Sequence, residues 1–350
     1  MTLAARLDDL LADVRPVDEG AAAAARDRHD RLVKPPGSMG RLEELGARLA
    51  AIAGRCPPPV PERPVVVVAA ADHGVHAQGV TPWPQAVTTA MLGQLCGGTA
   101  AVNVLAAAVG ASVTVLDVGC ANEPPDHPRL RKARVRAGTA DLTSGPAMTR
   151  EEATRAVLSG AGVVEELAGA GADLVVPGDM GIANTTAGAC LVAALTGAPP
   201  AAVTGRGAGD DTTLARKVAV VEAALARHAA DADEPLAVLA ALGGLEHAAL
   251  AGVVLAAAAE GLPVVLDGLA SNAAALAAAA LCPPVVGYLV AGHRSPEPGA
   301  GACLAALGLP PLLDLGLRIG EGTGGALAIP LVRAAAAVLR DMGELSAVDS

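Results

Sequence analysis

The 350-residue sequence contains no phenylalanine, one tryptophan and one tyrosine. Proteins that bind single-stranded nucleic acid stack the bases on several aromatic side chains, so this mode of binding is excluded on any scale. Positive charge is also scarce, because 25 Lys and Arg residues stand against 36 Asp and Glu residues and give a net charge of −11. Since nucleic-acid binding needs a basic surface, we expect no nucleic-acid partner.

The sequence also lacks paired cysteines and apolar runs of membrane length. Its six cysteines are scattered and none forms a Cys-x-x-Cys pair, so we interpret them as small buried residues in a reducing compartment. The longest apolar runs, such as residues 248–259, are shorter than the roughly 18 residues that span a bilayer. No signal peptide is recognisable at the charged N-terminus. We therefore expect a cytoplasmic protein with no membrane partner.

What the sequence does contain is a series of short, continuous apolar runs separated by longer helical stretches. Such runs are typical of strands that are buried on both faces of a parallel sheet. The alternation predicts an α/β fold, with a doubly wound, mostly parallel sheet and helices on both faces. The predicted strands are residues 65–70, 113–118, 174–177, 264–266 and 285–290, and the predicted helices include residues 150–168, 212–228, 246–260 and 322–342.

Both ends of the chain have a helical pattern. Residues 1–55 look helical with a break at residues 34–38, and the prolines of residues 57–61 indicate a linker. We predict that residues 60–310 form an α/β domain that carries the active site. Residues 1–59 and 311–350 are predicted to pack together as a small helical domain.

Polar, glycine-rich segments follow four of the predicted strands, at residues 71–76, 178–186, 267–272 and 292–299. Because ligands bind beyond the carboxyl ends of the strands in open α/β sheets, these segments predict one shared pocket. In the second segment, Gly181 allows close approach of the backbone, and Asn184, Thr185 and Thr186 can cap the next helix or bind a phosphate. A helix cap without a ligand is the alternative.

Three further motifs are weaker. The glycine-rich turn at residues 204–211 lacks the preceding strand of a dinucleotide-binding fingerprint, and Lys217 beyond it either supplies charge to a phosphate or is solvated. Asp72, His73 and His76 are a weak signal for a metal site, because a third convincing ligand is missing. The sequence contains neither a Walker loop nor a Gly-x-Ser-x-Gly elbow, which argues against a P-loop kinase and an α/β-hydrolase.

Residues 315–324 place one carboxylate, Glu321, among four glycines at the start of an apolar helix. Glycines let the backbone approach a ligand closely, and a helix N-terminus favours anionic groups. Glu321 is therefore a candidate proton acceptor. The alternative is a solvated carboxylate that only decorates the start of the helix.

Taken in order, eight segments resemble the nicotinate-nucleotide–dimethylbenzimidazole phosphoribosyltransferase family. They are residues 34–43, 71–75, 84–88, 178–186, 205–207, 265–268, 292–299 and 315–324. The resemblance implies a doubly wound domain, a small helical domain from both chain ends, and a homodimer. It also implies transfer of the 5-phosphoribosyl group of nicotinate mononucleotide to 5,6-dimethylbenzimidazole or a related base, with inversion at C1′ and without a cofactor or metal.

The same resemblance assigns roles to individual residues. It makes Glu321 the general base, and it places Thr81, Gln85, Thr89 and Ile319 around the acceptor base. The residues that it assigns to the nucleotide and its phosphate are Gly178, Asp179, Met180, Gly181, Asn184, Gly207, Lys217 and Ser295.

The chain departs from the family pattern at four positions. The family usually has Glu at the position of Asp179 and often has His at that of Ala300, and Thr81 and Thr89 replace the commoner Ser and Gln. These changes leave the implied reaction in place and bear on which benzimidazole or related base the enzyme prefers as acceptor. A phosphatase or kinase would need a metal cluster or a P-loop, and a non-catalytic nucleotide-binding protein would not need Glu321.

Overall fold

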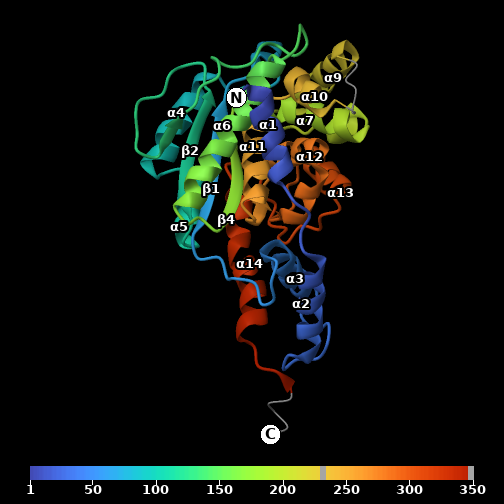
Figure 1. The fold of residues 1–350 in the computed structure, drawn as a ribbon. Helices are drawn as coiled ribbons and strands as arrows, with labels where there is room; N and C mark the ends of the chain where they lie inside the picture. Colours follow the sequence, from blue (N-terminus) through green and yellow to red (C-terminus); the bar gives the residue numbers. More distant parts are fainter. Residues whose placement is uncertain (229–233, 346–350) are drawn as a thin grey trace.

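The computed structural model describes residues 1–228 and 234–345, and its centre is a six-stranded parallel sheet (Figure 1). The strand order is β3-β2-β1-β4-β5-β6. The strands are β1 (Pro64–Ala71), β2 (Ser112–Gly119), β3 (Leu130–Lys132), β4 (Leu174–Met180), β5 (Val264–Leu266) and β6 (Leu289–Ala291). The predicted doubly wound sheet is thereby confirmed.

Strand β1 shows why the sheet is covered on both sides. All eight of its residues are buried, and the seven from Val65 to Ala71 belong alternately to two separate apolar clusters. Val65 and Val67 belong to the larger cluster, whereas Val66 and Val68 belong to the other one. Since successive side chains of a strand point to opposite faces, an unbroken Val and Ala run suits a strand with helices on each side.

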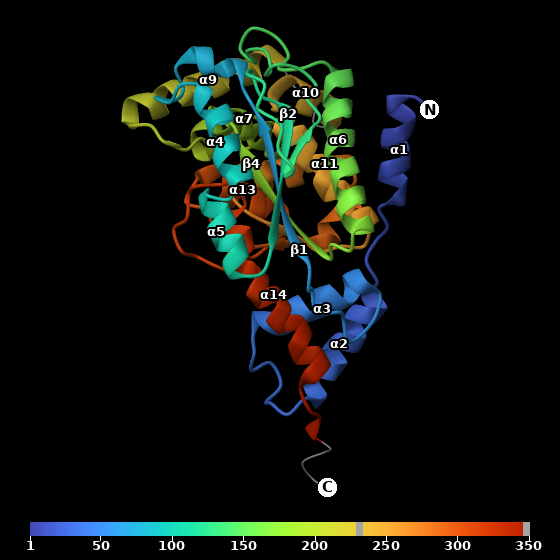
Figure 2. The same cartoon turned by 90° about the vertical axis from the view of Figure 1, so that its left-hand side faces the viewer.

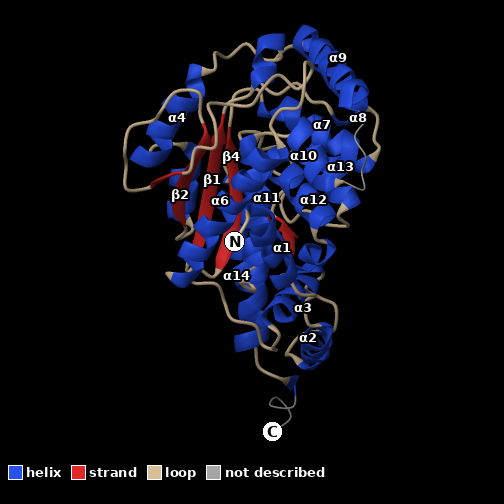
Figure 3. Cartoon of the chain, turned by 45° about the horizontal axis from the view of Figure 1, so that its top comes forward, coloured by secondary structure: helices blue, strands red, loops and turns tan. Residues whose placement is uncertain are grey.

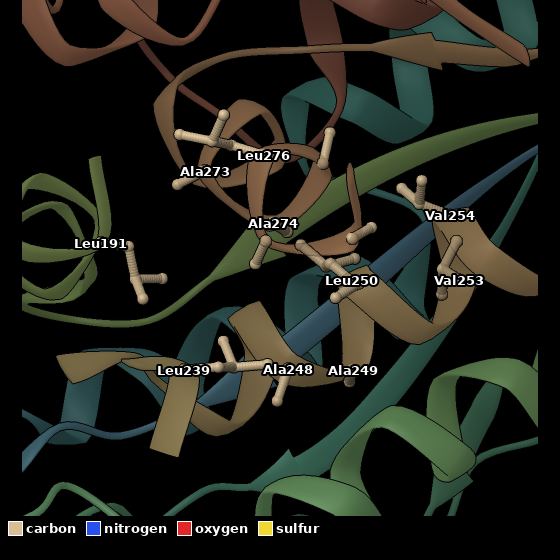
Figure 4. Close-up of a cluster of buried hydrophobic side chains, with 14 of the residues drawn as sticks. Leu191, Leu239, Ala248, Ala249, Leu250, Val253, Val254, Ala273, Ala274 and Leu276 are labelled. Atoms are coloured by element: carbon tan, nitrogen blue, oxygen red, sulfur yellow. The ribbon is translucent and has the colours of Figure 1, made fainter. Parts of the chain in front are cut away.

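The larger cluster is built from helices on one face of the sheet. Helices α6 (Arg150–Gly169), α11 (Leu245–Ala259) and α12 (Leu269–Leu281) form its centre, and α1 (Leu3–Asp13) lies against α6 and α11 (Figures 2 and 3). The close-up in Figure 4 shows Ala, Val and Leu side chains that α11 and α12 contribute to this cluster. The remaining helices on this side are α7 (Asn184–Thr196), α8 (Pro200–Val203), α9 (Asp211–His228), α10 (Pro235–Leu242) and α13 (Pro298–Ala306).

The opposite face is covered by α4 (Ala86–Gly97), α5 (Ala101–Ala108) and the first part of α14 (Thr323–Asp341). The far part of α14 leaves the sheet and packs with α2 (Glu19–Arg31) and α3 (Arg41–Ala53) in a lobe of their own (Figure 1). Ala25, Ala47, Ala50 and Leu339 form the core of this lobe. The domain boundaries near residues 60 and 310 stay a prediction.

Two stretches, residues 86–108 and α14, are long and apolar enough to cross a membrane by length and composition alone. Neither stretch is a continuous apolar run, because the first contains Gln94 and Asn103 and α14 contains Arg333. In the structure, the first is two separate helices, and α14 packs against β4, β5 and α3. This packing accounts for the apolar character of α14, because its buried residues complete the second cluster.

Two details of the predicted sheet are wrong. Residues 283–288 form a 3-10 helix (Pro283–Tyr288), and only the last two residues of the predicted strand 285–290 belong to β6. Pro283 and Pro284 stand just before the predicted strand, at the start of this 3-10 helix, where the fixed φ angle of proline suits a helix start. Strand β3 was not predicted, because three residues with two charged side chains give no apolar run.

The strand order places the candidate pocket. The direction of winding reverses between β1 and β4, which are hydrogen-bonded neighbours in parallel register. Ligands bind in the crevice outside the carboxyl ends of the strands at such a reversal. Of the four polar, glycine-rich segments predicted from the sequence, residues 71–76 and 178–186 lie at the carboxyl ends of β1 and β4, and Gly178 and Asp179 are themselves part of β4.

Candidate functional site

Glu321 lies in a tight turn that leads directly into α14. Gly320, Glu321 and Gly322 all have positive φ angles, of 79°, 63° and 90°. Glycine adopts this conformation without strain, but a residue with a side chain rarely does. The backbone at Glu321 is therefore held in place by its surroundings, which is a feature of functional sites.

The Glu321 side chain is almost completely buried, with an exposed fraction of 4%. Its Oε2 accepts a hydrogen bond of 3.4 Å from the Val102 N–H, at the first turn of α5. Burial raises the pKa of Glu321 above the ordinary carboxyl value, the Val102 N–H opposes the rise, and the Asp267 carboxylate adds to it. A carboxyl group with a raised pKa is a stronger proton acceptor once it is ionised.

Strand β4 touches the Glu321 turn through Gly178. A Cβ atom at Gly178 would lie 2.3 Å from the carbonyl oxygen of Glu321, so a glycine is needed for this contact. Asp179 follows, and a Cβ atom at Gly320 would lie 3.3 Å from Asp179 Oδ1. The structure thus brings Gly178 and Asp179 against Glu321.

Asp179 is buried among other acidic groups. Burial raises its pKa to about 8, and the carboxylates of Asp267, Glu246 and Glu321 add to this rise. The Asn184 amide donates a hydrogen bond to Asp179 and opposes the rise. The prediction that Asn184 caps α7 is wrong, because Ala183 is the N-cap residue, in a left-handed conformation, and no side chain caps this helix. Met180 and Gly181 connect Asp179 to that helix start.

Lys217 on α9 is buried, so the alternative of a solvated lysine is wrong. Its exposed fraction is 1%, and Nζ donates a 2.8 Å hydrogen bond to Oγ1 of Thr185, in the first turn of α7. Burial lowers the pKa of Lys217 to about 8, against the attraction of Glu297. A Cβ atom at Gly207 would lie 3.4 Å from Lys217 Nζ, so Gly207 joins the same group.

Glu297 connects Gly207 to Ser295. The Gly207 N–H donates to Glu297 Oε1 at 3.1 Å, and the Glu297 N–H donates to Ser295 Oγ at 3.3 Å. The candidate phosphate residues therefore form a continuous group around the uncapped start of α7. An amide-lined helix start beside a lysine is a suitable setting for a phosphate.

The residues assigned to the acceptor base lie on the loop after β1, on α4 and on the Glu321 turn. Gln85 donates from Nε2 to the His73 carbonyl at 3.0 Å, and Thr81 Oγ1 accepts from the Trp83 N–H at 3.3 Å. Thr89 donates to the Asn122 carbonyl at 3.5 Å. Ile319 is 55% exposed. Within the described residues, no hydrogen bond joins Thr81, Thr89 or Ile319 to Glu321.

Thr88 is a site residue that the sequence analysis did not identify. It is fully buried on α4, and its Oγ1 accepts a hydrogen bond of 3.1 Å from the Ile182 N–H. This bond connects α4, which carries Thr89 of the predicted acceptor site, to the turn that precedes α7. A threonine next to Thr89 carries no sequence signal that distinguishes a buried role from an exposed one.

His73, Glu246 and His247 are the group in the described chain whose ligand atoms lie close enough for a metal ion. One oxygen of Glu246 lies 2.8 Å from His73 Nε2 and 2.7 Å from His247 Nδ1. A tetrahedral zinc would hold its ligand atoms farther apart, at about 3.3 Å. His76 lies elsewhere, with Nε2 2.9 Å from the Trp83 carbonyl, so the set of Asp72, His73 and His76 is wrong.

The Glu246 group has electrostatic consequences. Burial opposes ionisation of Glu246, but the two imidazoles outweigh it and hold the pKa of Glu246 below its ordinary value. Burial likewise opposes the charged form of His73, but Glu246 outweighs it and raises the His73 pKa. Glu246 and His73 form a buried salt bridge that fixes the His73 side chain. The carbonyl oxygen of His73 in turn accepts the hydrogen bond from Gln85.

Comparison with known proteins gives one consistent result over nearly the whole chain. A family model described as "Phosphoribosyltransferase" matches residues 14–348. A nicotinate-nucleotide–dimethylbenzimidazole phosphoribosyltransferase of Salinispora tropica is 55% identical over 351 residues, with 96% of each chain covered. One of Chloroflexus aggregans, with the same name, is 52% identical and covers 94% of this chain and 93% of its own. A crystal structure of such an enzyme from Thermus thermophilus superposes with a TM-score of 0.90 at 50% identity, covering 95% of this chain and 98% of its own.

Proposed function

Because the chain belongs to the nicotinate-nucleotide–dimethylbenzimidazole phosphoribosyltransferase family, we propose that it transfers the phosphoribosyl group of nicotinate mononucleotide to 5,6-dimethylbenzimidazole or a related base. The products are nicotinate and α-ribazole 5′-phosphate. The observation that carries the proposal is the buried Glu321 carboxylate in its strained turn, which contacts Gly178 of β4 where the order of the strands reverses.

In this proposal the nucleotide binds at the carboxyl end of β4. Lys217 and the amides at the start of α7 bind the 5′-phosphate, together with Gly207 and Ser295. Their support is the continuous group of contacts that runs from Thr185 to Ser295. Holding both substrates in a fixed relative orientation supplies much of the rate acceleration.

The chemistry is a displacement at C1′ of the ribose. A ring nitrogen of the base attacks C1′, and the electron pair of the broken glycosidic bond returns to the pyridinium nitrogen of the departing nicotinate. Because this leaving group is cationic at the start and neutral in its ring at the end, it needs no general acid. Attack from the opposite face converts the β-nucleotide into an α-riboside.

The second ring nitrogen of the acceptor must lose its proton for the product to be uncharged. Glu321 accepts that proton in the proposed mechanism. Two observations support this role: the pKa of Glu321 is raised, and the Glu321 turn lies against Gly178 and Asp179, two of the residues assigned to the nucleotide. Thr81, Gln85, Thr89 and Ile319 surround the acceptor in this proposal.

We further propose a homodimer that acts in the cytoplasm. Three large apolar side chains, Trp83, Leu315 and Ile319, are more than half exposed in the single chain. Burial of such side chains against a second copy of the chain would be favourable. All six cysteines are free, as in proteins of a reducing compartment.

The direct test is incubation of the purified protein with nicotinate mononucleotide and dimethylbenzimidazole, followed by chromatography for free nicotinate. We expect nicotinate to appear only when both substrates are present. Nicotinate release that does not depend on the base would indicate a hydrolase, and no release with any of a panel of benzimidazoles would contradict the proposal.

A further inference from the structure

Asp267 is a buried carboxylate that caps α14 from another element of the fold. It follows β5 and is 1% exposed. Its Oδ1 accepts hydrogen bonds from the N–H groups of Gly324 and Gly325, at 2.7 and 3.1 Å, and its Oδ2 accepts one from Gly322 at 3.2 Å. The N-cap residue of α14 is itself a glycine with no side chain, so Asp267 performs the capping that a local Ser or Asp usually performs.

Other contacts fix the Asp267 carboxylate in place. The Asp267 N–H donates to Ser271 Oγ at 3.1 Å, and His293 Nε2 lies 3.3 Å from Oδ1. The His293 ring packs against the helix start so closely that a Cβ atom at Gly324 would lie 2.1 Å from it. Asp267 therefore has no freedom to move independently of the start of α14.

This cap acts on the peptide that follows Glu321. The Gly322 N–H, which Asp267 binds, belongs to the peptide group between Glu321 and Gly322. On its other side the same peptide rests on Gly178 of β4. Since Glu321 has a positive φ angle, the turn relaxes when the hydrogen bonds that hold it are lost.

We propose that Asp267 is a positioning residue of the transfer reaction, which holds the Glu321 peptide in its left-handed conformation and so fixes where the Glu321 carboxylate lies. The proposal rests on the proposed function, in which Glu321 is the proton acceptor. Asp267 also places a negative charge near Glu321, which favours the protonated form of Glu321. Asp267 therefore acts on both the position and the proton affinity of Glu321.

The test compares Asp267→Asn with Asp117→Asn, a matched control. Asp117 is also 1% exposed, lies near the end of β2, and accepts two backbone N–H bonds, from Gly119 at 3.1 Å and Cys120 at 2.9 Å. Both variants should lower the melting temperature. Only Asp267→Asn should lower kcat, by roughly tenfold or more, with the KM for nicotinate mononucleotide nearly unchanged.

A second readout does not depend on turnover. In protein labelled with 13C at the side-chain carboxyl of glutamate, the Glu321 resonance is assigned by its absence in Glu321→Gln. Its titration midpoint should move to lower pH in Asp267→Asn, because a neighbouring negative charge is removed, and should stay in place in Asp117→Asn. An inactive wild-type enzyme would refute the proposed function and leave this measurement intact.

Two results would overturn the role of Asp267. One is a folded Asp267→Asn variant with wild-type kcat and an unchanged Glu321 midpoint. The other is a loss of kcat in both variants in proportion to the decrease in their melting temperatures, which would show that a general loss of stability causes it. If Asp267→Asn does not fold, Ser271→Ala removes only the acceptor of the Asp267 N–H and should lower kcat about threefold, whereas an unchanged kcat would overturn the role.

Discussion

At the scale of single residues, the carboxylate of Glu321 is the group on which the proposed proton transfer depends. Glu321→Gln keeps the size of the side chain and its place in the turn but removes the proton acceptor. We expect kcat to fall by about 10²–10⁴-fold, the usual contribution of a general base, while both substrates still bind. In the wild-type enzyme, the acidic limb of the kcat profile should lie above the ordinary glutamate pKa, because burial raises the pKa of Glu321. A variant with near wild-type kcat at every pH would show that Glu321 is not the base.

Lys217 predicts a pH dependence of nucleotide binding. Its pKa is lowered to about 8, so the amine is charged below that pH and neutral above it. The KM for nicotinate mononucleotide should therefore rise as the pH passes about 8, because a neutral amine no longer attracts the phosphate. Initial rates between about pH 7 and pH 9 measure this. Lys217→Met should have a high KM that is flat over the same range, and a Met variant with an unchanged KM would remove Lys217 from the phosphate site.

The sequence identified most of these residues but not their surroundings. Glu321 was predicted because a carboxylate among glycines is visible in the order of residues, whereas Asp179 was assigned through the family resemblance. The burial of Lys217 was not predictable, since a lysine on a helix is usually solvated and its partner Thr185 lies 32 residues away. The capping role of Asn184 failed because its amide binds Asp179 instead.

At the scale of elements, the crossing of α6 and α11 is the tightest contact in the larger core. A Cβ atom at Gly160 would lie 1.8 Å from the Ala249 carbonyl oxygen, and one at Gly252 would lie 1.8 Å from that of Val157. Gly160→Ala should therefore force the helices apart and lower the free energy of unfolding by about 1–3 kcal/mol, the usual cost of overpacking. Denaturation with urea measures the change.

Gly162 on the same helix provides the control. A Cβ atom there meets nothing within 4 Å, so Gly162→Ala should raise the free energy of unfolding by about 0.5–1 kcal/mol through helix propensity alone. If Gly160→Ala and Gly162→Ala had equal stabilities, the close crossing of α6 and α11 would not exist in solution.

The sequence predicted elements well where the apolar pattern was long and continuous. Strands β1, β2, β4 and β5 and helix α6 appear where they were expected, the last starting with the capping box of Thr149 and Glu152. The pattern failed for β6, where the first four residues of the predicted run continue a 3-10 helix that begins at Pro283, and for β3, which has no apolar run. Local sequence therefore predicts a strand only when burial on both faces requires a continuous run of apolar residues.

At the scale of the whole molecule, the strand order determines which segments meet, and the sequence does not contain that order. The glycine-rich segments after the strands predicted one pocket, but not that the segments after β1 and β4 would be its centre. The links across the sheet from Asp267 to Gly322 and from Thr88 to Ile182 join residues 55 and 94 positions apart. Such contacts depend on the three-dimensional fold, and no local pattern predicts them.

The measurement that tests the central claim most directly is the structure of the product formed from nicotinate mononucleotide and dimethylbenzimidazole. Proton NMR of the isolated riboside 5′-phosphate distinguishes the two anomers by contacts of the C1′ proton across the sugar ring. We predict an α-riboside formed in equal amount to the released nicotinate, as a single displacement from the opposite face requires. A β-riboside, or nicotinate released in excess of any riboside, would contradict the account.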